Sequence, residues 1–79
     1  MRVVKEMLIK EIRVTVFSWN NKYLIKFEQG MIEQTFKVNE TDVGIEEDLA
    51  VFYSDPFLLG IQRRFDEMHQ SLREELGKI

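Results

Sequence analysis

The chain has no cysteine, a single histidine and a single proline among its 79 residues. Without cysteine, neither a disulfide framework nor a thiolate zinc site can form, and one histidine excludes every site that needs two. The four glycines are isolated from one another, so there is no glycine-rich phosphate loop. We therefore expect no cofactor and no metal.

Long apolar runs are missing as well. No stretch approaches the roughly 20 apolar residues of a membrane span. Charged residues also interrupt the N-terminal segment MRVVKEMLIKEIRV, which excludes the apolar centre of a signal peptide. With 44% hydrophobic and 32% charged residues, the composition is typical of a folded globular protein. We expect one soluble, cytoplasmic domain over residues 1–79, without membrane contact.

Basic residues are absent from the middle of the chain. Residues 38–62 hold six acidic residues and no basic one, whereas residues 1–37 hold seven Lys or Arg and four Glu, and the net charge is −3. The acidic segment is interpreted either as the solvated start of a helix or as a surface that repels nucleic acid and docks a basic partner.

Apolar and polar residues alternate with period two along the first half of the chain, which predicts strands. The turn residues between them place three strands of an antiparallel β-meander at about 11–19, 22–28 and 31–38. Residues 1–9 fit either a helical stripe or an extension of the first strand. They are interpreted as a flexible or sheet-extending N-terminal segment.

The first hairpin has a register that can be checked. Asn20-Asn21 suit a two-residue turn, because asparagine tolerates the positive φ that such a turn needs. The predicted pairs are Arg13–Glu28, Val14–Phe27, Thr15–Lys26, Val16–Ile25, Phe17–Leu24, Ser18–Tyr23 and Trp19–Lys22. One face is then apolar and the other carries an opposite-charge pair, a combination that favours this register.

The second turn is predicted at Gln29-Gly30, because glycine takes positive φ without strain. This register pairs Phe27 with Ile32 on the core face. Gln34 is the one discordant residue of that face, and we expect it to lie at a sheet edge or to bond a backbone group of a helix.

Two helices follow, a short one at about 45–53 and a long one at about 56–76, separated by Pro56. The apolar residues of the long helix have a 3-4-3-4 spacing; they are Leu58, Ile61, Phe65, Met68 and Leu72, extended by Leu76. The predicted fold is α+β, with both helices packed on one sheet face. The last turns of the long helix, with Met68, Leu72 and Leu76, overhang the sheet.

No set of residues predicts an enzyme. His69 lies near Asp66 on the long helix, a pair that can tune a general base, but no nucleophile can be placed beside it. Glu46, Glu47 and Asp48 point about 100° apart on a helix, so they cannot converge on one cation. We expect no catalytic and no metal-binding residues.

The apolar residues outside the predicted core indicate a protein contact, because aromatic, leucine and methionine side chains are common anchors of interfaces. The candidate interaction surface consists of Phe17, Trp19, Leu24, Met68, Leu72 and Leu76. In the alternative, residues 1–10 or the far end of the long helix cover the patch of Phe17, Trp19 and Leu24. We predict a non-enzymatic protein–protein interaction module that forms a homodimer or binds a protein partner.

The same sheet face supports a second hypothesis, the binding of single-stranded nucleic acid by aromatic stacking. The residues concerned are Phe17, Trp19, Lys22, Lys26 and Lys37. Glu28 and Glu33 share this face, and the isoelectric point near 5.1 weakens the attraction to phosphates. Nucleic acid is therefore the alternative and not the first hypothesis.

The run VTVFSWNNKYLIKFEQGMIEQTFKV followed by RRFDEMHQSLREEL resembles short uncharacterised bacterial proteins, of the domain-of-unknown-function type, with a three-strand, two-helix plan. The resemblance covers about residues 10–76 and rests on the general pattern. It implies a small cytosolic bacterial protein and supplies no functional residues.

Overall fold

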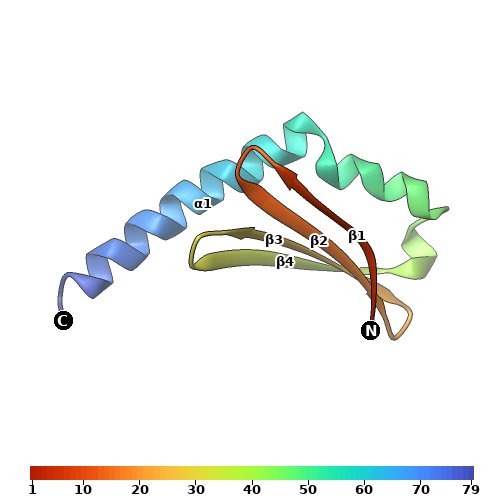
Figure 1. The fold of residues 1–79 in the computed structure, drawn as a ribbon, viewed down its shortest axis with the longest axis horizontal. Helices are drawn as coiled ribbons and strands as arrows, with labels where there is room; N and C mark the ends of the chain where they lie inside the picture. Colours follow the sequence, from red (N-terminus) through yellow and green to blue (C-terminus); the bar gives the residue numbers. More distant parts are fainter.

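The computed structural model describes residues 1–79 and has an α+β fold in which an antiparallel sheet is followed by helices (Figure 1). The strands, in sheet order, are β1 (Arg2–Ile9), β2 (Ile12–Trp19), β3 (Lys22–Gln29) and β4 (Ile32–Asn39). The helices are two 3₁₀ helices, η1 (Glu40–Asp42) and η2 (Glu46–Tyr53), and the α-helix α1 (Asp55–Leu76).

The prediction of a three-stranded sheet was wrong, because residues 2–9 form a fourth strand, β1, which pairs antiparallel with β2. Two features hid this strand. Its turn consists of Lys10 and Glu11, which have φ angles of 49° and 68° although neither is a typical residue for positive φ. A bulge between Val3 and Lys5 also interrupts the alternation of the strand.

The predicted hairpin of β2 and β3 is confirmed, because all seven expected pairs from Arg13–Glu28 to Trp19–Lys22 are present. Asn20 and Asn21 have φ angles of 53° and 63°, as a type I′ turn requires.

The predicted register of the next hairpin was wrong by two residues. The turn consists of Gly30 and Met31, so Phe27 pairs with Gln34 instead of Ile32. Gly30 has a φ of 62° and Met31 a negative φ, the pattern of a type II′ turn. Because side chains alternate with period two, a slip of two residues keeps every side chain on its predicted face.

Both η2 and α1 pack on one face of the sheet, which we call the core face. Ten buried residues form a single cluster there: Ile12, Val14, Val16, Tyr23, Ile25, Phe27, Leu49, Leu58, Ile61 and Phe65. Phe36 and Phe57 extend the cluster through ring contacts with Phe27, at centroid distances of 6.1 and 5.8 Å. The helices therefore cover only one of the two faces of the sheet, and Thr15 is the one buried residue of the other face.

The short helix differs from the prediction in type. The segment predicted as a helix at 45–53 is the 3₁₀ helix η2, in which Leu49 and Phe52 are three residues apart and lie on one side. The Ile45 N–H donates to the Asp48 carboxylate at 3.1 Å and closes the first turn. The long helix, predicted at about 56–76, is confirmed as α1 (Asp55–Leu76).

Gln34 bonds a helix backbone group, as predicted. Its Nε2 donates to the Ile61 carbonyl at 3.0 Å, and its Oε1 accepts from Arg64 Nε at 3.1 Å. Nearby, the Gln29 and Gln62 side chains bond each other at 2.8 and 3.2 Å. These amides fix α1 over the end of the sheet that carries the β3–β4 turn.

Candidate interaction surfaces

The second face of the sheet, which we call the open face, has no layer of chain packed on it (Figure 1). Strand by strand, its side chains are Val3, Glu6 and Leu8 on β1; Arg13, Thr15, Phe17 and Trp19 on β2; Lys22, Leu24, Lys26 and Glu28 on β3; and Glu33, Thr35, Lys37 and Asn39 on β4. The confirmed hairpin register is what places Phe17, Trp19 and Leu24 together on this face.

An apolar patch of Val3, Phe17, Trp19 and Leu24 lies at the end of the open face that carries the β2–β3 turn. Val3 pairs with Phe17, and Phe17 pairs with Leu24, so the three side chains form one row across β1, β2 and β3. Phe17 and Leu24 are half-buried, whereas Val3 is exposed and Trp19 keeps 50% of its surface exposed. The patch is not covered by residues 1–10 or by the long helix.

Sequence reasoning missed Val3 and the exposed Leu8, which β1 adds to the open face. The regular spacing of the hairpin turns points to this strand, but it appears only in the observed register. The two turns of the β2–β3 and β3–β4 hairpins, at Asn20-Asn21 and Gly30-Met31, are ten residues apart. The same spacing counted backwards reaches the Lys10-Glu11 turn, whereas the predicted turn at Gln29-Gly30 gives a spacing of nine residues and misses it.

Charged side chains surround the apolar patch and mostly pair within the face. Arg13 Nη1 lies 3.1 Å from the Glu6 carboxylate, and Lys26 Nζ lies 3.5 Å from that of Glu28. The Lys26 ammonium also lies 5.6 Å from the centroid of the Phe17 ring, within the range of a cation–π contact. The open face is thus nearly neutral, in contrast to the acidic chain as a whole.

The lysines of the nucleic-acid hypothesis all lie on the open face, but in different surroundings. Lys22 pairs with Trp19, and Lys37 pairs with Leu24, at the end that carries the apolar patch. Lys26 is engaged by Glu28 and Phe17 in the middle of the face. Two lysines therefore remain beside the exposed indole.

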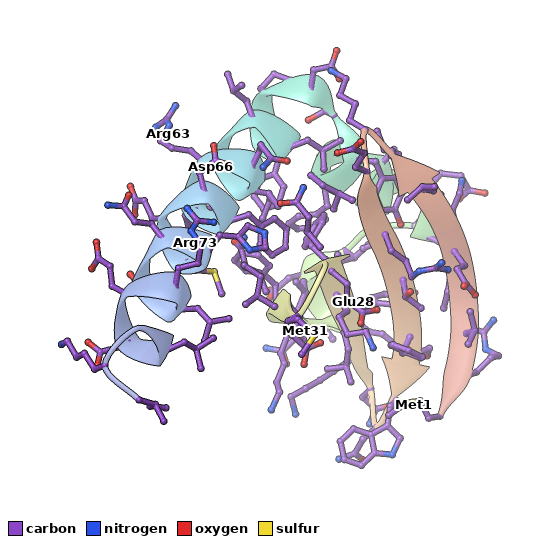
Figure 2. All side chains as sticks on the ribbon, turned by 60° about the vertical axis from the view of Figure 1, so that its left-hand side comes forward. Met1, Glu28, Met31, Arg63, Asp66 and Arg73 are labelled. Carbon is purple, nitrogen blue, oxygen red and sulfur yellow. The ribbon has the colours of Figure 1, made fainter.

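The last turns of α1 continue past the β3–β4 turn, as predicted (Figure 1). Its distal stripe consists of Met68, Leu72 and Leu76. Met68 is half-buried, whereas Leu72 and Leu76 are 38% and 57% exposed. Figure 2 shows Met31 at the β3–β4 turn and Arg63, Asp66 and Arg73 along the helix. The distal stripe belongs to the core-face side, so the structure does not bring it together with Phe17, Trp19 and Leu24.

His69 is part of the contact between α1 and the β3–β4 hairpin. Its Nε2 lies 3.1 Å from Gln29 Oε1, and its ring lies 6.4 Å from that of Phe65. Asp66 does not contact it; the Asp66 carboxylate accepts from Gln62 Nε2 at 3.0 Å. The arrangement orients the helix and contains no nucleophile.

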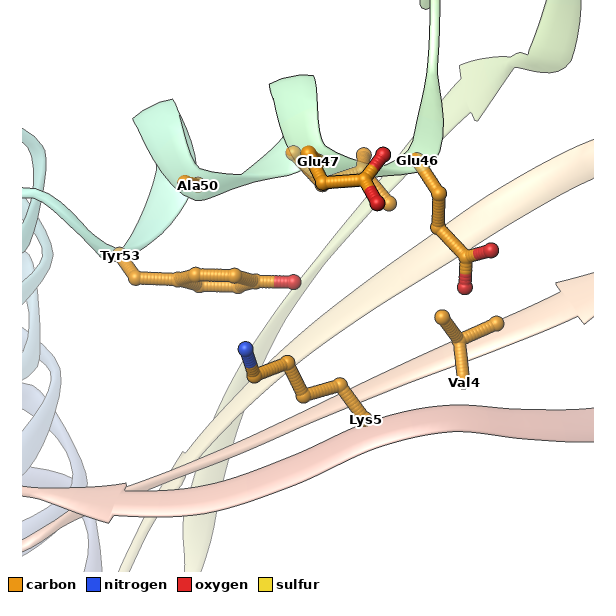
Figure 3. A pocket seen from close by; sticks show the side chains of 7 residues that line it. Val4, Lys5, Glu46, Glu47, Ala50 and Tyr53 are labelled. Carbon is orange, nitrogen blue, oxygen red and sulfur yellow. The ribbon is translucent and has the colours of Figure 1, made fainter.

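A pocket of about 480 Å³ lies between β1 and η2 (Figure 3). Lys5 Nζ lies 5.7 Å from the centroid of the Tyr53 ring, and the pocket also includes Val4, Glu46 and Glu47. Burial raises the pKa of the Tyr53 hydroxyl, and the Glu46 carboxylate raises it further. No group of three or more His, Asp or Glu side chains is placed to hold a metal ion.

Comparisons with protein-family models, with curated proteins and with solved structures found no match to this chain. The resemblance to short bacterial proteins therefore stays a prediction. None of the helices combines the length and the apolar character that crossing a membrane requires.

Proposed function

We propose that this protein is a non-enzymatic interaction module that self-associates as a homodimer. The observation that carries the proposal is the apolar patch of Val3, Phe17, Trp19 and Leu24, which no part of the chain covers. Contiguous exposed apolar patches are characteristic of contact sites on small proteins. Burying such a surface contributes about 25 cal/mol per Å², and the chain has only ten residues in its own core.

A protein contact agrees with the chemistry of the rest of the surface. No hydrogen bond joins Lys5 or Tyr53 to a carboxylate of the pocket, and His69 bonds Gln29, so neither site shows the hydrogen-bonded nucleophile and base that an acyl or phosphoryl transfer would need. On the open face, Arg13 pairs with Glu6 and Lys26 pairs with Glu28, instead of these charges converging on one point. A cytoplasmic location and a bacterial source stay predictions from the sequence.

Solution mass by light scattering tests the proposal directly. For a chain of 9.5 kDa, we expect about twice the monomer mass, and a Trp19→Ala variant that shifts toward the monomer. The far-UV circular dichroism of the variant controls for folding. A monomer at all accessible concentrations would contradict self-association and favour a different protein as the partner.

Binding of single-stranded nucleic acid is the second candidate, favoured by Lys22 and Lys37 at the same end of the open face as Trp19. Oligonucleotide titration at low salt, followed by the fluorescence of Trp19, tests it, because this indole is the only one in the chain. A saturable change that weakens with salt supports this candidate, whereas an unchanged emission rejects it.

A further inference from the structure

We infer that the open face is the dimer interface and that two copies pack face to face about a two-fold axis parallel to the strands, running between β2 and β3. This inference rests on the self-association proposed above and assigns its surface and arrangement. The helices of both copies then lie on the outside, and the two sheets form the two layers of a sandwich with aligned strands.

The contacts between the two copies follow from the position of the two-fold axis. A two-fold axis between two neighbouring strands exchanges them, so β2 of one copy lies over β3 of its partner. Each open-face residue of β2 and β3 then lies over the partner's copy of its own cross-strand neighbour, while β1 lies over the partner's β4. Every pair of the β2–β3 register on this face therefore becomes a contact between copies, formed twice by symmetry.

The apolar pair lies near the centre of this arrangement. Phe17 and Leu24 are cross-strand neighbours, so Phe17 lies over the partner's Leu24, and Leu24 lies over the partner's Phe17. Both side chains are only half-buried in one copy, so each has surface left to bury. The interface around Phe17 and Leu24 is thus apolar, as in the core of most homodimer interfaces, and Thr15 and Lys26 lie beside this pair in the middle of the face.

The flanking pairs match in charge. Arg13 lies over the partner's Glu28, and the Trp19 indole lies over the partner's Lys22, a cation–π arrangement. Lys26 already has the Glu28 carboxylate at 3.5 Å, so it is not buried as an unpaired charge.

The area of the open face is compatible with a dimer, whereas that of the distal stripe is not. Four strands spaced about 4.8 Å apart, with eight residues of about 3.4 Å each, give the face roughly 500 Å² in projection, and protruding side chains enlarge the accessible area. A standard interface buries about 800 Å² per partner. The part of α1 beyond His69 is only about 10 Å long and about as wide.

Charge reversal at Arg13 and Glu28 tests the arrangement. In the homodimer of Arg13→Glu, two glutamates face each other at both contacts, and in that of Glu28→Arg, two arginines do. We expect each variant alone to self-associate roughly tenfold to a hundredfold more weakly. Mixing the two restores opposite charges at both contacts, so the mixture should form a heterodimer of nearly normal affinity, measured by sedimentation velocity.

The mixed sample separates an interface role from a role within one copy, because mixing cannot repair a contact inside a single chain. A chain with both reversals should form homodimers again, and a Leu72→Lys variant should remain dimeric. Charge variants that stay dimeric, or a mixture that stays monomeric, would overturn the inference although self-association stands. A monomeric unmodified chain would refute the proposed function itself, and oligonucleotide binding by that monomer would assign the open face to nucleic acid.

Discussion

The two faces of the sheet belong to the same strands, but the helices of the chain cover only one of them. On the core face, Val14, Val16, Ile25 and Phe27 are fully buried by helices of the same chain. On the open face, Phe17 and Leu24 are half-buried, and Trp19 is half-exposed. The side chains of both faces alternate along β2 and β3, so the backbone is shared and only the covering differs.

This difference separates folding from assembly. The core face holds the ten-residue cluster and therefore determines the stability of one copy. The open face has an apolar patch exposed to water, with ion pairs beside it. This surface is therefore available to bind another molecule. Substitutions on the two faces should consequently act on different equilibria.

The largest effect is expected from Phe27→Ala on the core face. Phe27 is fully buried and contacts Phe36 and Phe57, so the cavity should reduce the free energy of unfolding by about 3–5 kcal/mol. Urea unfolding followed by circular dichroism measures it. Phe17→Ala on the open face is the matched control and should cost the isolated copy less than half as much; equal losses would remove the distinction between the faces.

Leu24→Lys should show the opposite behaviour. A charge at the centre of the inferred interface has no partner there, so dimerisation should weaken at least about a hundredfold. The isolated copy should unfold with nearly unchanged free energy, because this side chain is only half-buried. Sedimentation and urea unfolding of the same sample measure both effects. A Leu24→Lys variant that unfolds like Phe27→Ala and stays dimeric would reverse the assignment of the faces.

Gln34→Ala tests how α1 is fixed over the core face. The variant loses the bonds to the Ile61 carbonyl and to Arg64, and should lower the free energy of unfolding by about 1 kcal/mol without changing the dimer. Gln70→Ala, an exposed glutamine of α1 whose Nε2 donates to Glu74, is the control, for which we expect little change. An unaffected Gln34→Ala would mean that apolar packing alone positions the helix.

The smallest effect is expected at the β1–β2 turn and is stabilising. Lys10 and Glu11 adopt positive φ, which favours asparagine and glycine. Replacing the pair by Asn-Gly should raise the free energy of unfolding by up to about 1 kcal/mol. The exposed ion pair of Lys10 with Asp55, at 3.4 Å, should cost little to remove. Destabilisation of the variant would show that this turn is held by its side chains instead.

The sequence predicts the β2–β3 hairpin completely, because its turn residues and its alternation agree. It does not predict β1, since the Lys10-Glu11 turn has no local preference for positive φ and the bulge shifts the pattern. The predicted β3–β4 register was wrong because it placed Gln29 in the turn. In the structure Gln29 continues β3, and its side chain bonds Gln62 on α1. The contact with α1, which no local pattern encodes, accompanies the place of Gln29 in the strand.

The candidate surfaces were predictable in part, because the periodicity of the side chains assigns residues to faces. Period two assigns Phe17, Trp19 and Leu24 to one face, and the 3-4 spacing assigns Met68, Leu72 and Leu76 to one stripe. Neither pattern predicts whether a terminus or a helix covers the face of Phe17, Trp19 and Leu24. Neither pattern places Val3 beside them. The Lys5–Tyr53 pocket depends on how η2 meets β1, which no local pattern encodes.

The most direct test of the central claim is an isotope-filtered nuclear Overhauser experiment on a mixture of ¹³C-labelled and unlabelled chains. It detects only contacts between copies, although Phe17 and Leu24 are also neighbours within one copy. A dimer through the open face predicts intermolecular signals from the ring of Phe17 to the methyl groups of Leu24. Intermolecular signals from Leu72 and Leu76 alone, or no signal in a sample of dimer mass, would contradict it.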